Sequence, residues 1–170
     1  MSDDFDPYYD SEVKRADESI KASLEIAKGL ISSLPQDNDI RTTSILVGAG
    51  FELLFDTMLR YRFETDRFSK DFMINKKREI LESERVIDKT CSTDLKVILN
   101  IRNHCAHQIK IDEKLIRSWI HGIKTYQDKE NMKGKNTGEE LQKISICIMD
   151  DMKKYFIAYV TSCVDAVGGA

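Results

Sequence analysis

The stretch Asp94-Leu-Lys-Val-Ile-Leu-Asn-Ile-Arg-Asn-His-Cys-Ala-His107 combines a helical apolar pattern with a cluster of reactive side chains. When it is projected as a helix, with about 100° per residue, its apolar residues fall on one arc, as expected of a helix that faces a core. The residues on this arc are Leu95, Ile98, Leu99, Ile101, Cys105 and Ala106. No other part of the chain combines both features, so the rest of the sequence is interpreted around this helix.

Arg102 falls inside the apolar arc. A guanidinium stays charged at any ordinary pH, so an arginine among leucines and isoleucines needs a carboxylate, backbone carbonyls, a partner chain or an anion. Two explanations remain open. Arg102 bonds helix-terminal carbonyls or an acid such as Glu52 or Asp56, or else a second chain or a phosphate completes its surroundings.

A polar strip runs beside the arc. Asn103 and His107 are four residues apart and therefore share one helix face. Lys96 and Asn100 extend the same strip. His104 points roughly opposite the arc and is interpreted as a surface or structural residue.

The composition fits one soluble domain, since 170 residues with 41% hydrophobic and 32% charged can form a proper core. No apolar run approaches the roughly 20 residues that cross a bilayer, and the N-terminus lacks the pattern of a secretion signal. We therefore expect a cytoplasmic protein with no membrane contact. The net charge of −3 argues against a protein that coats nucleic acid indiscriminately, but it leaves a local RNA site open.

The four cysteines form no C-x-x-C pair, so they are expected to pack as small apolar side chains. With the histidines poorly spaced as well, neither a zinc site nor any other cofactor is expected.

Apolar residues recur at helical spacing along the chain, with no strand pattern and no repeat, which predicts an all-α bundle of five or six helices. An acidic tail, residues 1–10, precedes a single helical domain, residues 11–167. The expected helices are 11–34, 40–63, 68–87 with a break near 75–78, 94–107, 112–123 and 139–167. Residues 124–138 are polar and are predicted to form a mobile loop.

The helix 40–63 is apolar nearly all round and is expected to be the central one. Gly48 and Gly50 in its middle are unfavourable for a helix, so they are predicted to let a neighbouring helix approach closely.

Two charged segments and one capping segment remain to be interpreted. Arg60 and Arg62, with Arg67 just beyond, form either a solvated helix end or one wall of an anion site. The charge run at residues 76–78 is interpreted as a solvated face. The residues Cys91-Ser-Thr93 are predicted to cap the helix that follows.

The motif Ile101-Arg-Asn-x-x-Ala-His107 is preceded by Asp94-Leu-x-x-Ile-x-x-Ile and followed by Ile-x-Ile-Asp-Glu-x-x-Ile. This pattern resembles the core motif of the HEPN superfamily and, within it, of the mannitol operon repressor (MltR)-like proteins. The resemblance covers roughly residues 40–165 and is weakest between residues 69 and 86. It implies a HEPN-like helical bundle that often dimerises so that two such motifs meet in one cleft.

Many HEPN domains are metal-independent endoribonucleases, and the resemblance implies the same chemistry here. His107 is then the general acid or base on the ribose 2′-hydroxyl, Arg102 holds the scissile phosphate, and Asn103 orients His107 or the phosphate. Imidazole titrates near neutral pH and a guanidinium offers a fixed fork of donors, which suits both roles. The candidate RNA-binding residues around them are Arg60, Arg62, Arg67, Lys96 and Asn100.

MltR-like relatives are commonly described as regulators, so the resemblance also permits a non-catalytic interaction module. The expected partners are a second copy of the chain, RNA, and an antitoxin or regulatory protein. Geometry sets one condition on catalysis, because residues five apart on a helix diverge by about 140°. Arg102 and His107 converge only if the helix ends near His107 or if the two residues come from opposite chains.

Overall fold

The computed structural model describes residues 7–34, 39–65 and 72–168, and within them it contains helices and no strand. The elements are α1 (Pro7–Ser32), α2 (Ile40–Phe63), α4 (Ile74–Ser83), α5 (Lys89–His107), α6 (Glu113–His121), α7 (Lys124–Gln127), the 3-10 helix η1 (Glu130–Met132) and α8 (Thr137–Gly168). The all-α prediction is confirmed. The expected count of five or six helices is wrong, because the described residues contain seven α-helices.

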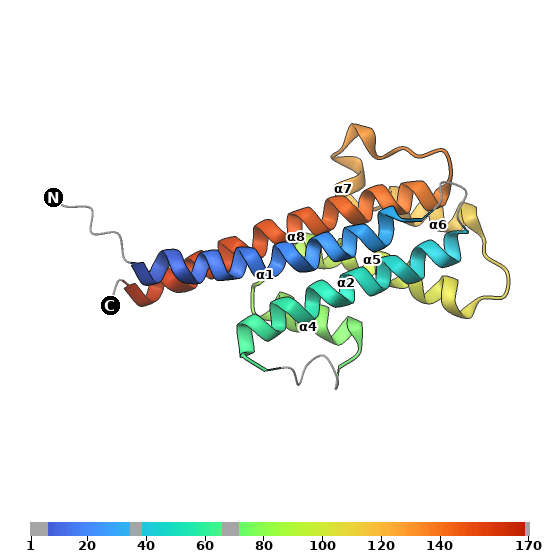
Figure 1. The fold of residues 1–170 in the computed structure, drawn as a ribbon. Helices are drawn as coiled ribbons and strands as arrows, with labels where there is room; N and C mark the ends of the chain where they lie inside the picture. Colours follow the sequence, from blue (N-terminus) through green and yellow to red (C-terminus); the bar gives the residue numbers. More distant parts are fainter. Residues whose placement is uncertain (1–6, 35–38, 66–71, 169–170) are drawn as a thin grey trace.

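The long helices α1 and α8 run antiparallel, and the start of α1 lies beside the end of α8 (Figure 1). The helix α2 contacts α1, α4, α5 and α8, which confirms that residues 40–63 form the central helix. Its N-terminus is capped by Asp39, whose carboxylate accepts a hydrogen bond from the backbone N–H of Arg41 at 3.2 Å. The residue just before α2 therefore supplies its cap.

By length and composition, α2 is the one helix of the described residues that could cross a membrane, contrary to the expectation that no segment would qualify. In the bundle, 56% of its apolar window is buried. The core helix of a soluble protein meets the same criterion, so this is weak evidence for a membrane span.

Gly50 lies where three helices meet. A Cβ atom at this position would lie 2.9 Å from Met149 Cε of α8 and 3.4 Å from Ala27 Cβ of α1. The missing side chain therefore lets α1 and α8 approach α2, which confirms the predicted close approach at this glycine.

Several helix boundaries differ from those expected. The helix α1 begins at Pro7 and not at Ser11, since proline is well suited to a first helical turn. Of the predicted helix 68–87, residues 66–71 lie outside the described residues, and α4 runs without interruption through the predicted break at 75–78. Residues 1–6 of the predicted tail also lie outside the described part.

The helix α5 begins five residues before Asp94, at Lys89. Asp88 caps it by accepting a hydrogen bond from the backbone N–H of Cys91 at 2.6 Å, so the predicted cap at Cys91-Ser-Thr93 is wrong. A carboxylate placed one residue before the helix is a strong N-cap, which frees Cys91 and Ser92 to be buried inside α5.

The predicted solvated charge run is also wrong, because two of its residues are buried against neighbouring helices. Lys77 is fully buried, and its Nζ lies 2.9 Å from Glu52 Oε1 and 2.8 Å from Asp56 Oδ1, both on α2. Burial opposes the charged form, but hydrogen bonds to Asp56 and Glu52 outweigh it and raise the pKa of Lys77. These carboxylates hold α4 against α2.

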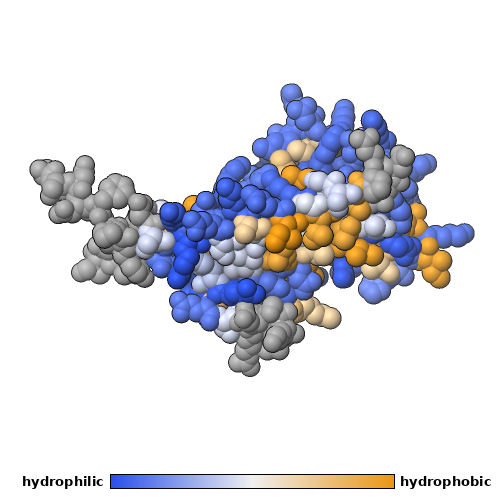
Figure 2. All heavy atoms as spheres, viewed as in Figure 1, coloured by the Kyte–Doolittle hydropathy of each residue, from blue (hydrophilic) through white to orange (hydrophobic). Residues whose placement is uncertain are grey.

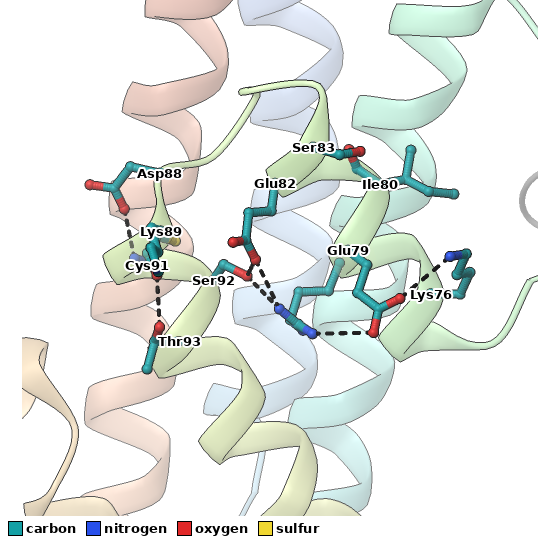
Figure 3. Close-up of polar contacts among 11 residues, drawn as sticks. Lys76, Glu79, Ile80, Glu82, Ser83, Asp88, Lys89, Cys91, Ser92 and Thr93 are labelled. Atoms are coloured by element: carbon teal, nitrogen blue, oxygen red, sulfur yellow. Dashed lines mark hydrogen bonds and ion pairs between the residues drawn. The ribbon is translucent and has the colours of Figure 1, made fainter.

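Arg78, the next residue, holds α4 against α5. Its guanidinium lies 3.3 Å from Glu82 and donates a hydrogen bond to the Ser92 hydroxyl of α5. Figure 3 shows Glu79, Glu82 and Ser92 around this contact between α4 and α5. The charge run thus forms part of an internal polar network.

The segment predicted as a mobile loop, residues 124–138, contains α7 and η1, and Met132 in η1 is buried. Its start is tied to α5 through the buried carboxylate of Asp94. That carboxylate accepts hydrogen bonds from the backbone N–H groups of Lys124 and Thr125, each at 3.0 Å, and from the Thr125 hydroxyl at 2.8 Å. Asp94 therefore caps α7 from another helix, while the mobility of the segment stays a prediction.

We expect Asp94→Ala to lower the free energy of unfolding by about 2 to 3 kcal/mol, since three donors lose a charged acceptor. Urea denaturation measures this loss, and hydrogen exchange at residues 124 and 125 should accelerate. Asp128→Ala is the matched control, because Asp128 is exposed and should give almost no change. Equal stability of the two variants would contradict the capping role.

Candidate functional site

The apolar arc of α5 packs into the core as predicted. Leu95, Ile98, Leu99, Ile101 and Cys105 are all buried. Ala106 was expected on the same arc, but it is exposed, and it lies in the last turn of α5, which ends one residue later.

The side chain of Arg102 extends from this arc over the surface of α2 at Gly48. A Cβ atom on Gly48 would lie 2.9 Å from Arg102 Cγ, so the absence of a side chain at Gly48 provides the room that Arg102 occupies. Arg102 is half-buried, and its Nη1 donates a hydrogen bond to Asn103 Oδ1 at 3.0 Å. Gly48 therefore accommodates an arginine side chain.

The carboxylates considered as partners for Arg102 are engaged elsewhere. Glu52 and Asp56 both bind Lys77. Within the described residues, the hydrogen bond to Asn103 is the polar contact that Arg102 makes, and no carboxylate pairs with it. The explanation through an acid on α2 is therefore wrong, and the explanation through a second chain or an anion stays open.

His107 is the last residue of α5 and is exposed. Gln108 continues in an extended conformation, with φ −87° and ψ 132°. The helix therefore ends at His107, which is one of the two conditions under which His107 and Arg102 of one chain can converge. The exit of the chain is held by Arg41 of α2, whose Nη2 donates to the carbonyl oxygen of Gln108 at 2.8 Å. In the described part, no hydrogen bond joins His107 to Arg102 or Asn103.

A cleft of about 530 Å³ lies between α5 and α6. We name it the α5–α6 cleft, and the residues that line it are Val97, Asn100, Asn103, His104, Ser118, Trp119 and Gly122. It contains two members of the predicted polar strip, Asn100 and Asn103. Lys96 is exposed outside it.

His104 was expected to be a surface or a structural residue, and the structure shows it packed against α6. Its ring packs edge-on against Trp119, with ring centroids 5.3 Å apart and an interplanar angle of 82°. Its Nε2 is buried and has no hydrogen-bond partner among the described residues. The helical projection missed this position because it considered α5 alone, and the covering side chain comes from α6.

The basic residues at the end of α2 form a separate surface. Arg60 is exposed, and Arg62 lies 3.1 Å from Glu84 and over the ring of Phe63. Arg67 lies outside the described residues. A helix rises about 1.5 Å per residue, so Arg60 is roughly 30 Å along α2 from Arg41, which marks the end nearest His107. The structure therefore does not bring Arg60 or Arg62 to the α5 motif.

No group of three or more metal-ligating side chains that could hold an ion occurs in the described residues. All four cysteines are unpaired. Burial raises the pKa of the Cys91 and Cys105 thiols, so neither is a reactive thiolate near neutral pH.

Comparison with known proteins finds no protein family whose model matches the chain, no matching curated protein and no matching solved structure.

Proposed function

We propose that this chain is a HEPN-type, MltR-like protein that binds RNA and cleaves it without a metal ion through Arg102, Asn103 and His107. The observation that carries the proposal is the environment of the Arg102 side chain. The residue is half-buried, and its guanidinium is bound to Asn103 and pairs with no carboxylate in the described residues. A charge in such a position suits an anionic ligand, and a phosphate fits the fork of a guanidinium.

The proposed reaction needs only groups of the protein and the RNA. His107 takes the proton of a ribose 2′-hydroxyl, and the 2′-oxygen forms a bond to the adjacent phosphorus as the bond from phosphorus to the 5′-oxygen breaks. The protonated His107 then returns the proton to the leaving 5′-oxygen. The products are a 2′,3′-cyclic phosphate and a 5′-hydroxyl. Arg102 stabilises the charge that builds on the phosphate oxygens, and Asn103 holds the guanidinium through the observed hydrogen bond.

We further propose that two chains form the complete site, because a partner would bring a second His107 toward Arg102. Exposed apolar side chains near the end of α5 support this arrangement, since Ile45 is 44% and Ile109 95% exposed. Figure 2 shows further hydrophobic side chains over α1 and α2, where Ile26 and Leu30 are exposed. Light scattering should report a homodimer, and a monomer at tens of micromolar protein would contradict the shared site.

The second candidate is a non-catalytic cytoplasmic regulator of the MltR-like kind. The apolar surface on α1 and α2 favours it, because such a surface suits an antitoxin or regulatory protein as well as a second copy. In that case the purified protein cleaves no RNA.

Incubation with mixed single-stranded RNA in EDTA separates the two candidates. The nuclease should cleave under these conditions, since the proposed chemistry uses no metal, and Arg102→Ala should cleave far more slowly with its helical circular dichroism unchanged. An absence of cleavage by the unaltered protein would leave the regulator as the better proposal.

Gly48→Ala should move Arg102 without unfolding the bundle. The new Cβ would lie 2.9 Å from Arg102 Cγ, so the arginine side chain must shift. Alanine favours the helix by about 1 kcal/mol, which offsets part of the steric cost. We expect the melting temperature to change little and RNA cleavage to fall by about tenfold or more, since small displacements of a catalytic group are costly.

Gly29→Ala is the matched control for this variant. Gly29 lies in α1, and a Cβ atom there meets nothing within 4 Å. It should raise the melting temperature slightly and leave cleavage unchanged. Equal cleavage by both variants would show that Gly48 does not position Arg102.

A further inference from the structure

We infer that the α5–α6 cleft binds an unpaired nucleobase, supplied either by single-stranded RNA or by a free nucleotide. The inference rests on the proposed function where RNA is the source, and it names the part of the RNA that the protein recognises. Its residues are distinct from the pair Arg102 and His107, although Asn103 belongs to both places.

The first argument is the buried nitrogen of His104. Native structures pair nearly all buried polar atoms, because an unpaired one loses its hydrogen bonds to water without replacement. His104 Nε2 is such an atom in a residue that lines the cleft. Because this nitrogen is closed to solvent, a ligand with a hydrogen-bonding edge would satisfy it once the His104 or Trp119 ring turns toward the cleft.

The second argument is the hydrogen-bonding capacity of the walls. In the described residues, the Asn100 amide makes no hydrogen bond, so it offers both a donor and an acceptor. Asn103 uses its Oδ1 for Arg102 and keeps its amide N–H groups. Ser118 donates to the carbonyl oxygen of Leu115 at 2.7 Å and keeps its lone pairs. Alternating donors and acceptors match the edge of a nucleobase.

The third argument is the shape and charge of the cleft. Val97 and the indole of Trp119 provide apolar surface for a planar ring, and aromatic side chains commonly contact unstacked bases. A volume of about 530 Å³ lies in the range of small-ligand sites. No carboxylate lines the cleft, and the Arg102 guanidinium is bound to Asn103 at its edge, so a phosphate attached to the base meets a positive charge.

Trp119 supplies the measurement, because it is the only tryptophan of the chain. Its fluorescence is followed while AMP, GMP, CMP, UMP and a five-nucleotide RNA are added separately in EDTA. At least one should cause a saturable change in emission, and inorganic phosphate should cause none. A response to mononucleotides alone identifies a nucleotide site, and a stronger response to the oligonucleotide identifies an RNA site.

Asn100→Asp and His104→Leu should each weaken the fluorescence-detected binding by about tenfold, since each removes a partner of the base edge. Asn131→Ala is the control, because Asn131 is exposed on η1. Circular dichroism melts verify that each variant is folded. The Asn100 variant keeps its size at an exposed position, so it tests the cleft even if the His104 variant unfolds.

The inference is overturned if no nucleotide or RNA changes the emission saturably, if inorganic phosphate changes it equally, or if Asn100→Asp binds like the unaltered protein. These outcomes are separable from those for cleavage. Cleavage without a saturable Trp119 response would refute base binding in the cleft and leave the proposed nuclease activity standing. A saturable response without cleavage would support base binding in the cleft and refute the proposed nuclease activity.

Discussion

Replacement of His107 by alanine should lower the rate of RNA cleavage by about 10²- to 10⁴-fold, the range typical for loss of a general acid or base. His107 is exposed at the end of α5 and makes no hydrogen bond in the described residues, so the variant should keep its fold. The rate is measured in EDTA on a labelled single-stranded RNA. Circular dichroism and light scattering verify that folding and assembly are unchanged.

His121→Ala is the matched control for this loss. His121 is also exposed, but its Nε2 lies 3.4 Å from Glu140 and its ring stacks on Tyr126, away from Arg102 and Asn103. The control should cleave at the unaltered rate. If both histidine variants cleave equally fast, His107 is not the catalytic acid or base.

The largest expected effect on stability comes from Lys77→Met, which should lower the free energy of unfolding by about 3 kcal/mol. Methionine keeps most of the length of the side chain, but Glu52 and Asp56 lose the cation between them. Both carboxylates reach solvent in part, so the loss lies at the low end of the range for a broken buried ion pair. Urea denaturation gives the value directly.

Lys76→Met is the natural comparison, because Lys76 is exposed and its Nζ lies 3.5 Å from the exposed Glu79. It should change the free energy of unfolding by no more than about 0.5 kcal/mol. A similar effect of both substitutions would contradict the role of Lys77 in holding α4 against α2.

The raised pKa of Lys77 fixes the pH range of its contribution. A lysine whose pKa is raised by folding stabilises the native state fully below the usual value of 10.5, and the contribution is lost as pH rises through the folded pKa. The difference in stability between the unaltered protein and Lys77→Met should therefore be constant near neutral pH and shrink in strong alkali.

Local signals were sufficient to predict the central helix and several of its neighbours. Asp39 and Asp112 each precede an apolar periodic segment, and each accepts backbone hydrogen bonds at the start of a helix. The predicted end of the helix 94–107 was also correct, since α5 ends at His107. These features depend on residues close together in the chain.

Features that depend on distant residues were missed. Lys77 looked solvated because its carboxylates lie on α2, 21 and 25 residues earlier in the chain. The short helix α7 depends on Asp94. The carboxylate of Asp94 accepts a hydrogen bond from the backbone N–H of Lys124, which lies 30 residues later in the chain. His104 is covered by Trp119 of α6. A helical projection considers one helix at a time, so it cannot place such partners.

Analysis of the RNA ends produced in EDTA tests the proposed chemistry most directly. Mass spectrometry of the fragments should find 2′,3′-cyclic phosphates and 5′-hydroxyls with the unaltered protein, and intact RNA with His107→Ala. Fragments that carry 3′-hydroxyls and 5′-phosphates, or RNA left intact by the unaltered protein, would contradict cleavage by Arg102, Asn103 and His107.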